Sequence, residues 1–157
     1  MNSTTSEPRA LVRRSSADDI DVVIRLFRRT AGHAWPFLDP DVLEAGLFRF
    51  RDAGFGRSVV WVAERGGGIV GFCAMRTGWI DHFYVAPEHQ GRGVGQLLIG
   101  RALKGRRRVR LWTFQRNTRS RLFYALQGFS EARRTDGAAN GGGEPDILME
   151  WRRPVTG

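Results

Sequence analysis

Three glycines at alternate positions, Gly91, Gly93 and Gly95, separate a strand-like segment from a helical pattern. Residues 79–85 form an apolar run that Pro87 ends, and apolar residues at helical spacing follow the glycines. The first turn of a helix has main-chain N–H groups without an intrahelical partner and carries partial positive charge. Because glycine lacks a Cβ, a diphosphate can approach the main chain there. The segment therefore predicts a site for a phosphate ester.

The spacing of these glycines excludes two common nucleotide motifs. A dinucleotide-binding turn needs Gly-x-Gly-x-x-Gly, and a P-loop ends in Gly-Lys before Ser or Thr. Residues 90–95, Gln-Gly-Arg-Gly-Val-Gly, fit neither pattern. They resemble the pyrophosphate-binding turn of the GNAT N-acetyltransferase superfamily, which reads Gln/Arg-x-x-Gly-x-Gly/Ala after a strand ending Val-x-Pro. Gln90, Gly93 and Gly95 occupy the fixed positions, with Val85 and Pro87 ahead of them.

A second segment, residues 117–129, carries the same resemblance. Its sequence matches the superfamily pattern Asn-x-x-Ala/Ser-x-x-Phe-Tyr-x-x-x-Gly-Phe, at the distance from the glycine turn that one helix and one strand require. The two matches span residues 79–129, about a third of the chain. The resemblance implies an α/β (α+β) fold with a central mixed, mostly antiparallel sheet of six to seven strands. About four helices would flank this sheet, which would splay apart at strands 4 and 5.

The resemblance also implies acetyl-coenzyme A as co-substrate. Main-chain amides of residues 91–96 would hold its pyrophosphate, and Arg92 would add positive charge. The backbone of residues 83–85 would pair with the pantetheine arm like an added strand, and Asn117 would hydrogen-bond the same arm. The predicted cofactor-binding residues are Phe83, Tyr84, Val85, Gln90, Gly91, Arg92, Gly93, Val94, Gly95, Gln96 and Asn117.

Three residues are predicted to be catalytic. Tyr124 stands where many superfamily members have a general acid, and a phenol with a reference pKa near ~10 can protonate the departing thiolate of coenzyme A. The alternative is a core tyrosine on an apolar helix face. The acceptor amine must lose a proton, and Asp81 and His82, on opposite faces of the strand, are the candidate bases. His82 has the better reference pKa, but many relatives use an acidic residue on this strand, so both stay candidates.

Residues 32–40 contain two prolines and two large aromatic residues. The resemblance implies that this loop and its flanking helices form a wall of the acceptor site, so His33, Trp35 and Phe37 are the predicted substrate-binding residues. A hydrophobic lid packed on the core explains the same aromatic residues equally well. The acceptor itself cannot be read from the sequence, because it depends on loops whose shapes the sequence does not determine.

The remaining elements follow from apolar periodicity and from glycine and proline positions. The first helix starts near Ser16 or Asp18 and has Arg28 and Arg29 at its carboxyl end, while the last has Asn117 as its cap and Leu122, Phe123 and Leu126 as its apolar stripe. Residues 136–145 are too rich in glycine for a fixed shape without a partner. The other predicted helices are residues 41–52 and 93–104, and the predicted strands are residues 9–14, 58–64, 69–77, 79–85, 106–114, 131–135 and 146–153.

With 157 residues, of which 41% are hydrophobic, the chain has the size of one domain. We expect this domain to cover residues 9–157, after a flexible amino terminus of residues 1–8. No apolar run approaches the ~18 residues of a membrane span, and the polar amino terminus favours a cytoplasmic protein. Cys73 lies in an apolar run and is expected to be a small buried filler. The three histidines are too scattered for a metal site, and none is expected.

The charge of the chain is +9, and residues 104–121 contain eight Lys or Arg and no carboxylate. This stretch could be a nucleic-acid surface, an attraction for a phosphorylated cofactor, or a solvated face. We favour the last two because few aromatic residues are interleaved with the cations. A membrane partner is not expected, nucleic acid is the less favoured partner, and a homodimer is the default among oligomers.

The leading hypothesis is an acetyl-coenzyme A-dependent N-acetyltransferase that acts on the primary amine of a small molecule or an amino-acid-like acceptor. Acetylation of a macromolecule is the first alternative, at a protein amino terminus, a lysine side chain or a charged tRNA, and only the basic stretch favours it. A non-catalytic module that binds acetyl-coenzyme A or nucleic acid is the second. Retention of both the glycine turn and Tyr124 argues against such a module.

Overall fold

A computed structural model describes residues 6–156 and contains one seven-stranded sheet in the order β1-β2-β3-β4-β5-β7-β6. Every neighbouring pair is antiparallel except β4 and β5, which run parallel. The sheet is therefore mixed and mostly antiparallel, as predicted. The strands are β1 (Leu11–Arg14), β2 (Val59–Arg65), β3 (Gly68–Arg76), β4 (Trp79–Val85), β5 (Arg108–Phe114), β6 (Ser130–Thr135) and β7 (Asp146–Arg152).

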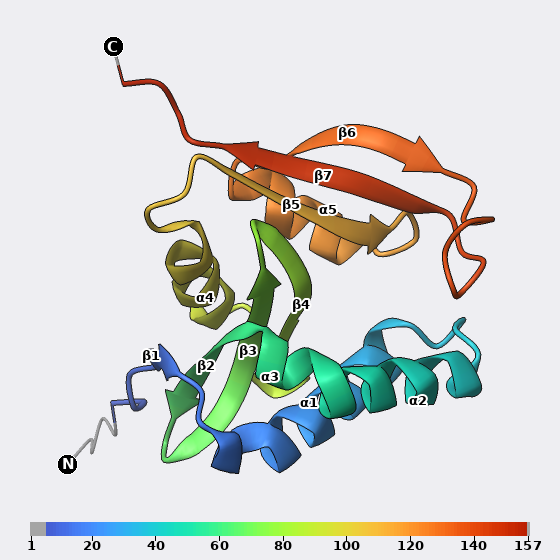
Figure 1. Cartoon of the computed structure of the whole chain (residues 1–157). Coiled ribbons are helices and arrows are strands. Elements are labelled where there is room, and N and C mark those ends of the chain that lie inside the picture. The colour runs from blue at the N-terminus through green and yellow to red at the C-terminus, as the bar shows by residue number, and fades with distance from the viewer. Residues whose placement is uncertain (1–5, 157) are drawn as a thin grey trace.

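The sheet splays apart between β4 and β5, as expected. The two strands pair only where Trp79 meets Arg110 and Ile80 meets Leu111, and we call this short contact the seam. Beyond it the two parts of the sheet diverge, with β2, β3 and β4 on one side and β5, β6 and β7 on the other (Figure 1). From Asp81 onward, the edge of β4 that faces β5 has no strand beside it among the described residues.

Helices cover both faces of the sheet. They are α1 (Ile20–Ala34), α2 (Pro40–Arg49), α3 (Phe55–Arg57), α4 (Val94–Leu103) and α5 (Thr118–Leu126), and a π-helical turn, Phe50–Gly54, joins α2 to α3. On one face, Phe27 of α1 and Leu47 of α2 pack with Val62 and Phe72. On the other, Leu98 of α4 and Tyr124 of α5 pack with Cys73, Leu111 and Ile147. Cys73 is fully buried, as predicted, and has no disulfide partner.

Two helix predictions need correction. The first helix does not end near Arg28 and Arg29 but continues to Ala34, because Gly32 is tolerated and the prolines come later; the N–H of Trp35 still reaches the carbonyl of Ala31 (2.8 Å). The apolar stripe of α5 is also wrong, because Leu122 and Leu126 are 62% and 75% exposed. The short helix α5 contacts the core along one side only, and the residues on that side are Phe123 and Tyr124.

The loop of residues 136–145 has a hydrogen-bonded shape, contrary to expectation. The Asn140 side chain donates to the carbonyl of Glu144 (2.7 Å) and to Asp146 (3.0 Å), and it accepts from the N–H of Gly142 (3.0 Å). A Cβ on Gly142 would lie 2.9 Å from Leu38, so the loop abuts the segment between α1 and α2. Side-chain hydrogen bonds within the loop thus hold its shape without the partner predicted from its glycine content.

The predicted flexible segment, residues 1–8, lies mostly outside the described residues. Within the described part, Glu7 forms an ion pair with Arg92. None of the helices in residues 6–156 combines the length and the apolar character needed to cross a bilayer.

Candidate functional site: a cavity through the seam

The glycine turn joins β4 to the first turn of α4. Gly91 and Gly93 have φ angles of 74° and 84°, which favour glycine, and the first backbone hydrogen bond within the helix reaches back from Leu97 to Gly93 (3.1 Å). The N–H groups that open α4 therefore have no intrahelical partner. The Gln90 side chain donates to the carbonyl of Val85 (2.9 Å) and fastens the turn to the end of β4.

The third glycine of the turn serves packing. A Cβ on Gly95 would lie 3.2 Å from two ring atoms of Phe123, so this glycine lets α5 approach the first turn of α4. The Phe123 ring also lies against Phe83 of β4, with ring centroids 5.6 Å apart. The two segments that carry the sequence resemblance are thus in direct contact.

A cavity of about 440 Å³ opens where β4 and β5 diverge. It runs between the α4–α5 face and the α1 face of the sheet, and it touches the glycine turn, β4, β5 and both helices α1 and α5. Most of the predicted site residues line it. These are Trp35, Asp81, His82, Phe83, Tyr84, Val85, Gln90, Gly91, Gly93, Gly95, Gln96, Asn117 and Tyr124.

Four predicted site residues do not line the cavity. The Arg92 side chain pairs with Glu7 instead of facing the cavity, and the Val94 side chain is buried in the core. His33 is exposed in the last turn of α1. Phe37 packs edge-on against Phe114, with ring centroids 5.7 Å apart. Phe37 is therefore packed as part of a hydrophobic lid.

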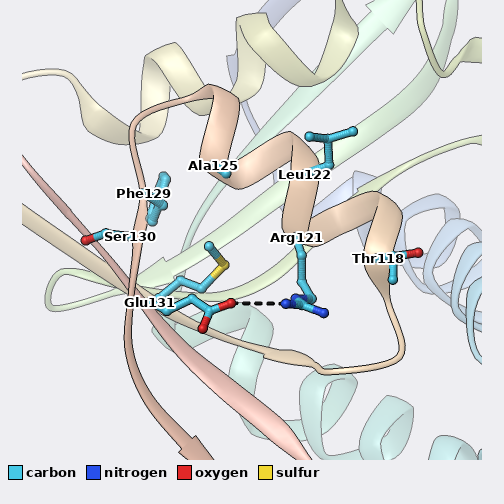
Figure 2. Close-up of a pocket in the computed structure, with 8 residues that line it drawn as sticks. Thr118, Arg121, Leu122, Ala125, Phe129, Ser130 and Glu131 are labelled. Atoms are coloured by element: carbon cyan, nitrogen blue, oxygen red, sulfur yellow. Dashed lines mark hydrogen bonds and ion pairs between the residues drawn. The ribbon is translucent and has the colours of Figure 1, made fainter.

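A second hollow lies between α5 and the start of β6, and in it Arg121 points toward Glu131 (Figure 2). It contains none of the predicted site residues. Its charges already neutralise each other, because Arg121 donates to Glu131 at 3.1 Å. The cavity at the seam is therefore the candidate functional site.

Tyr124 lies on the α5 side of this cavity and is 6% exposed. Its ring packs edge-on against Phe83 and tilted against Phe129, with centroid distances of 5.9 and 5.5 Å. Burial raises the pKa of the phenol above its ordinary value. Tyr124 is therefore neutral and able to donate a proton at neutral pH. Burial also raises the pKa of Tyr84 on the α1 side, and the nearby Tyr124 phenol adds to this effect.

A β-bulge at Asp81 interrupts β4 between Ile80 and His82. On β3 the neighbours Ala74 and Met75 pair with His82 and Ile80, so Asp81 is an extra residue that interrupts the regular alternation assumed from the sequence. As a result, Ile80 packs in the core beside α4, whereas His82 lies beside Phe27 on the α1 side. Asp81 lines the cavity and accepts a hydrogen bond from Arg76 (2.7 Å).

His82 is surrounded by aromatic rings. The ring centroids of Phe50 and Phe27 lie 4.4 and 4.7 Å from that of His82. Burial lowers the pKa of the imidazole to about 4; the charge of Asp81 opposes this change, and the charge of Arg76 adds to it. His82 is therefore neutral at neutral pH and can accept a proton, although its conjugate acid is stronger than that of an exposed histidine.

Sequence reasoning missed Thr30 of α1. This residue is 4% exposed, lines the cavity, and its Oγ1 has no hydrogen-bond partner within residues 6–156. The Nε1 of Trp35 is also buried and also has no hydrogen-bond partner within the described chain. The signal for Thr30 was one polar side chain within the apolar stripe of the first helix, after Phe27 at a spacing of three. Ser120, at the Ala/Ser position of the second motif, lines the cavity too, as do Arg119 and Thr113, which carried no signal.

Comparison with known proteins agrees with this geometry. The family model described as an acetyltransferase (GNAT) domain matches residues 56–131. An uncharacterized N-acetyltransferase from Archaeoglobus fulgidus is 31% identical over 153 residues, covering 83% of this chain and 97% of that protein. The peptidyl-lysine N-acetyltransferase YiaC from Escherichia coli is 24% identical over 120 residues, covering 76% of this chain and 82% of the relative.

Among solved structures, the PaiA N-acetyltransferase from Thermoplasma acidophilum in complex with coenzyme A has the same fold. Its TM-score is 0.74 with 17% sequence identity, over 92% of this chain and 99% of the other. Fold, glycine turn and relatives together define an acyltransferase class. The chain belongs to the GNAT acetyltransferase family, and it is an acetyl-coenzyme A-dependent N-acetyltransferase.

Proposed function

We propose that one domain, residues 9–157, transfers the acetyl group of acetyl-coenzyme A directly to the primary amine of a small molecule or an amino-acid-like acceptor. The observation that carries the proposal is the continuity of the cavity across the seam. Its cofactor half consists of the glycine turn, Asn117 and Tyr124; its acceptor half consists of Thr30, Trp35, His82 and Tyr84. Two substrates that enter from opposite faces of the sheet would meet beside Tyr124.

The cofactor half fits a pantetheine diphosphate. The unpaired N–H groups at the start of α4 would bind the pyrophosphate. The free edge of β4 at residues 83–85 would pair with the amides of the pantetheine arm. Asn117 uses its Oδ1 to cap α5 by accepting from the N–H of Ser120 (3.3 Å), so its amide nitrogen is the atom that would donate to the arm. Arg92, directed to Glu7, is not needed for this arrangement.

Tyr124 would act as the general acid. In acetyl transfer the amine nitrogen forms the new bond to the acetyl carbon, the bond from that carbon to sulfur breaks, and the sulfur needs a proton. A buried, neutral phenol beside the cavity can supply that proton. On the acceptor side, His82 would take the amine proton, directly or through water, because it lies with Thr30 and Trp35 and is uncharged.

The phenol of Tyr124 provides the direct test of the mechanism. We expect Tyr124→Phe to lower kcat by about 100-fold or more, because general acid catalysis is lost, while the packing against Phe83 and Phe129 is kept. The dissociation constant for coenzyme A should stay within about twofold, since the phenyl ring remains. Release of free thiol and the mass of the acetylated amine give kcat, and calorimetry gives the affinity. Unchanged turnover would remove Tyr124 from the mechanism.

The proton acceptor needs a parallel measurement. pH profiles of kcat/KM for His82→Gln and Asp81→Asn should differ, with the acid limb of the wild-type profile lost only in His82→Gln. Loss of that limb in Asp81→Asn alone would transfer the role to Asp81. Two unaltered profiles would mean that bulk water or another group removes the proton.

Acetylation of a lysine side chain in a protein is the second candidate, because the relative YiaC is named for that activity. The basic stretch supports it less than the sequence implied. Arg108 pairs with Glu150, Arg110 stacks on Trp79, and Arg121 pairs with Glu131, so these cations have partners within the fold. A panel of amines, polyamines and lysine peptides, assayed by thiol release, separates the two candidates. If no compound of the panel causes thiol release, a non-catalytic module is favoured. RNA binding that weakens steeply with salt would favour a charged-tRNA substrate.

A further inference from the structure

The carboxyl end of α1 contributes two residues with unpaired polar atoms, Thr30 and Trp35, to the lining of the cavity. Thr30 Oγ1 and Trp35 Nε1 are both buried, and neither has a hydrogen-bond partner in the described chain. Buried polar groups in native proteins nearly always have a partner, and the exceptions require an explanation. A bound acceptor that supplies the missing partner explains both atoms together.

The chemistry of the two atoms limits what they can bind. The indole Nε1–H of Trp35 only donates, and the hydroxyl of Thr30 can donate or accept. An oxygen with lone pairs is therefore the kind of group that could accept a hydrogen bond from either atom. Trp35 is held in place for this role, because its ring packs edge-on against Tyr84 of β4 and Phe114 of β5, with centroid distances of 5.7 and 5.1 Å.

The charges of the cavity decide whether that oxygen is charged. Asp81 and Arg119 are the charged residues that line the cavity in the described chain. Arg119 belongs to α5, on the cofactor side, and Asp81 is already paired with Arg76. A free carboxylate beside Thr30 and Trp35 would therefore be buried without a cation, which is costly. A second ammonium group, as in a polyamine, would likewise find no unpaired carboxylate.

We propose that Thr30 and Trp35 form a subsite for the neutral carbonyl oxygen of an α-amino amide. The acceptor amine would lie beside this carbonyl, as it does in an amino-acid amide or in the first residue of a peptide, and free amino acids and polyamines would be poor acceptors. The inference rests on the proposed function, since it names the acceptor class for the same cavity. Tyr84 lines the cavity, and the ring of the buried Phe27 is stacked against it with centroids 4.6 Å apart.

The experiment compares matched acceptors that differ only in the carbonyl. For alanine, leucine and phenylalanine, kcat/KM is measured for the amide, the free acid and the corresponding amine without the carbonyl. Dipeptide amides are added to distinguish a peptide from a single residue. We expect the wild type to prefer amides at least about tenfold over both other forms, as a hydrogen bond to a buried group requires.

Two conservative variants test the subsite itself. Thr30→Val and Trp35→Phe should each lower the preference for amides over carbonyl-free amines by about 3- to 10-fold, because one neutral hydrogen bond is lost. Trp61→Phe makes the same chemical change outside the cavity, where Trp61 is stacked beneath Arg101, and should leave the preference unchanged. A general loss of stability would lower all rates together and would not move the preference. An unchanged preference in both cavity variants would overturn the proposal.

A measurement of binding by NMR tests the subsite independently of catalysis. The indole N–H resonance of Trp35, assigned through Trp35→Phe, should shift on addition of alaninamide and much less with alanine. If no amine is acetylated but the resonance shifts selectively, the proposed function fails and the subsite stands. If amines are acetylated but neither the resonance nor the preference depends on the carbonyl, the subsite fails and the proposed function stands.

Discussion

The two halves of the cavity are built from different parts of the polypeptide. The proposed cofactor half offers main-chain groups: the N–H groups at the start of α4 and the free edge of β4. The proposed acceptor half offers side chains of α1 and β4 that aromatic rings hold in place. A main-chain site needs only glycines at the right spacing, whereas a side-chain site can change its specificity by substitution. We therefore expect substitutions to alter acceptor specificity more readily than cofactor binding.

The largest expected difference between the halves is in their response to acid. Burial lowers the pKa of His82 from an unfolded value near 6.5 to about 4, so the unfolded chain binds a proton that the folded chain excludes between these values. Stability from this histidine is therefore complete above pH 6.5 and is lost as the pH falls toward 4, by about 3 kcal/mol in all. Urea unfolding of the wild type and His82→Gln across this range measures the difference, because other titrating groups cancel.

A direct titration supports this measurement. The imidazole resonances of His82 in the folded wild type should move with a midpoint near pH 4. A midpoint near 6.5, together with equal pH dependence of stability in both proteins, would contradict the burial of a neutral histidine in the acceptor half.

The next largest effect should fall on the cofactor half alone. Gly95→Val would push against the Phe123 ring and separate α5 from the first turn of α4, weakening coenzyme A binding by roughly 30-fold. Gly100→Val is the matched control, because it lies in the same helix and a Cβ there meets nothing within 4 Å. Calorimetry with coenzyme A gives the affinities. Equal affinities for the two variants would show that this close packing does not shape the pyrophosphate site.

The smallest of the three effects should fall on the acceptor half alone. A Cβ on Gly137 would lie 2.3 Å from the main chain of Glu144, so Gly137→Ala must open the loop of residues 136–145 and release its contact with Leu38. We expect the KM of the acceptor to rise about tenfold, since small misplacements of a substrate wall are costly. Coenzyme A affinity should not change. Gly141→Ala, which meets nothing within 4 Å, is the control, and a similar KM in both variants would exclude this loop from the acceptor site.

The strand, turn and helix around the three glycines could be predicted from the sequence because their determinants are local. The strand, the proline, the three glycines and the helix all lie within residues 79–103, and Asn117 follows after one further strand. The splay at strands 4 and 5 could be expected as well, because the resemblance covers both strands. Local signals failed where packing decides, as in α5, where Leu122 and Leu126 satisfy helical spacing but lie exposed.

The acceptor half could not be predicted to the same depth for a physical reason. Its members come from α1, the following segment and β4, and only folding brings them together. The bulge at Asp81 depends on the register between β3 and β4, which no pattern in β4 alone reveals. Trp35 could be proposed as an aromatic residue beside two prolines, but the unpaired state of its Nε1 is a property of the packed structure.

The seam also has a consequence for the order of folding. Strands β1 to β4 follow one another as antiparallel neighbours, apart from the helices between β1 and β2, whereas β5, β6 and β7 pair among themselves. The two groups meet in the sheet through only two residue pairs. Because parallel pairing across a long crossover forms late, we expect each group to assemble before they dock. The catalytic cavity would then arise in the last step, as the space left between two folded units rather than a hollow within one.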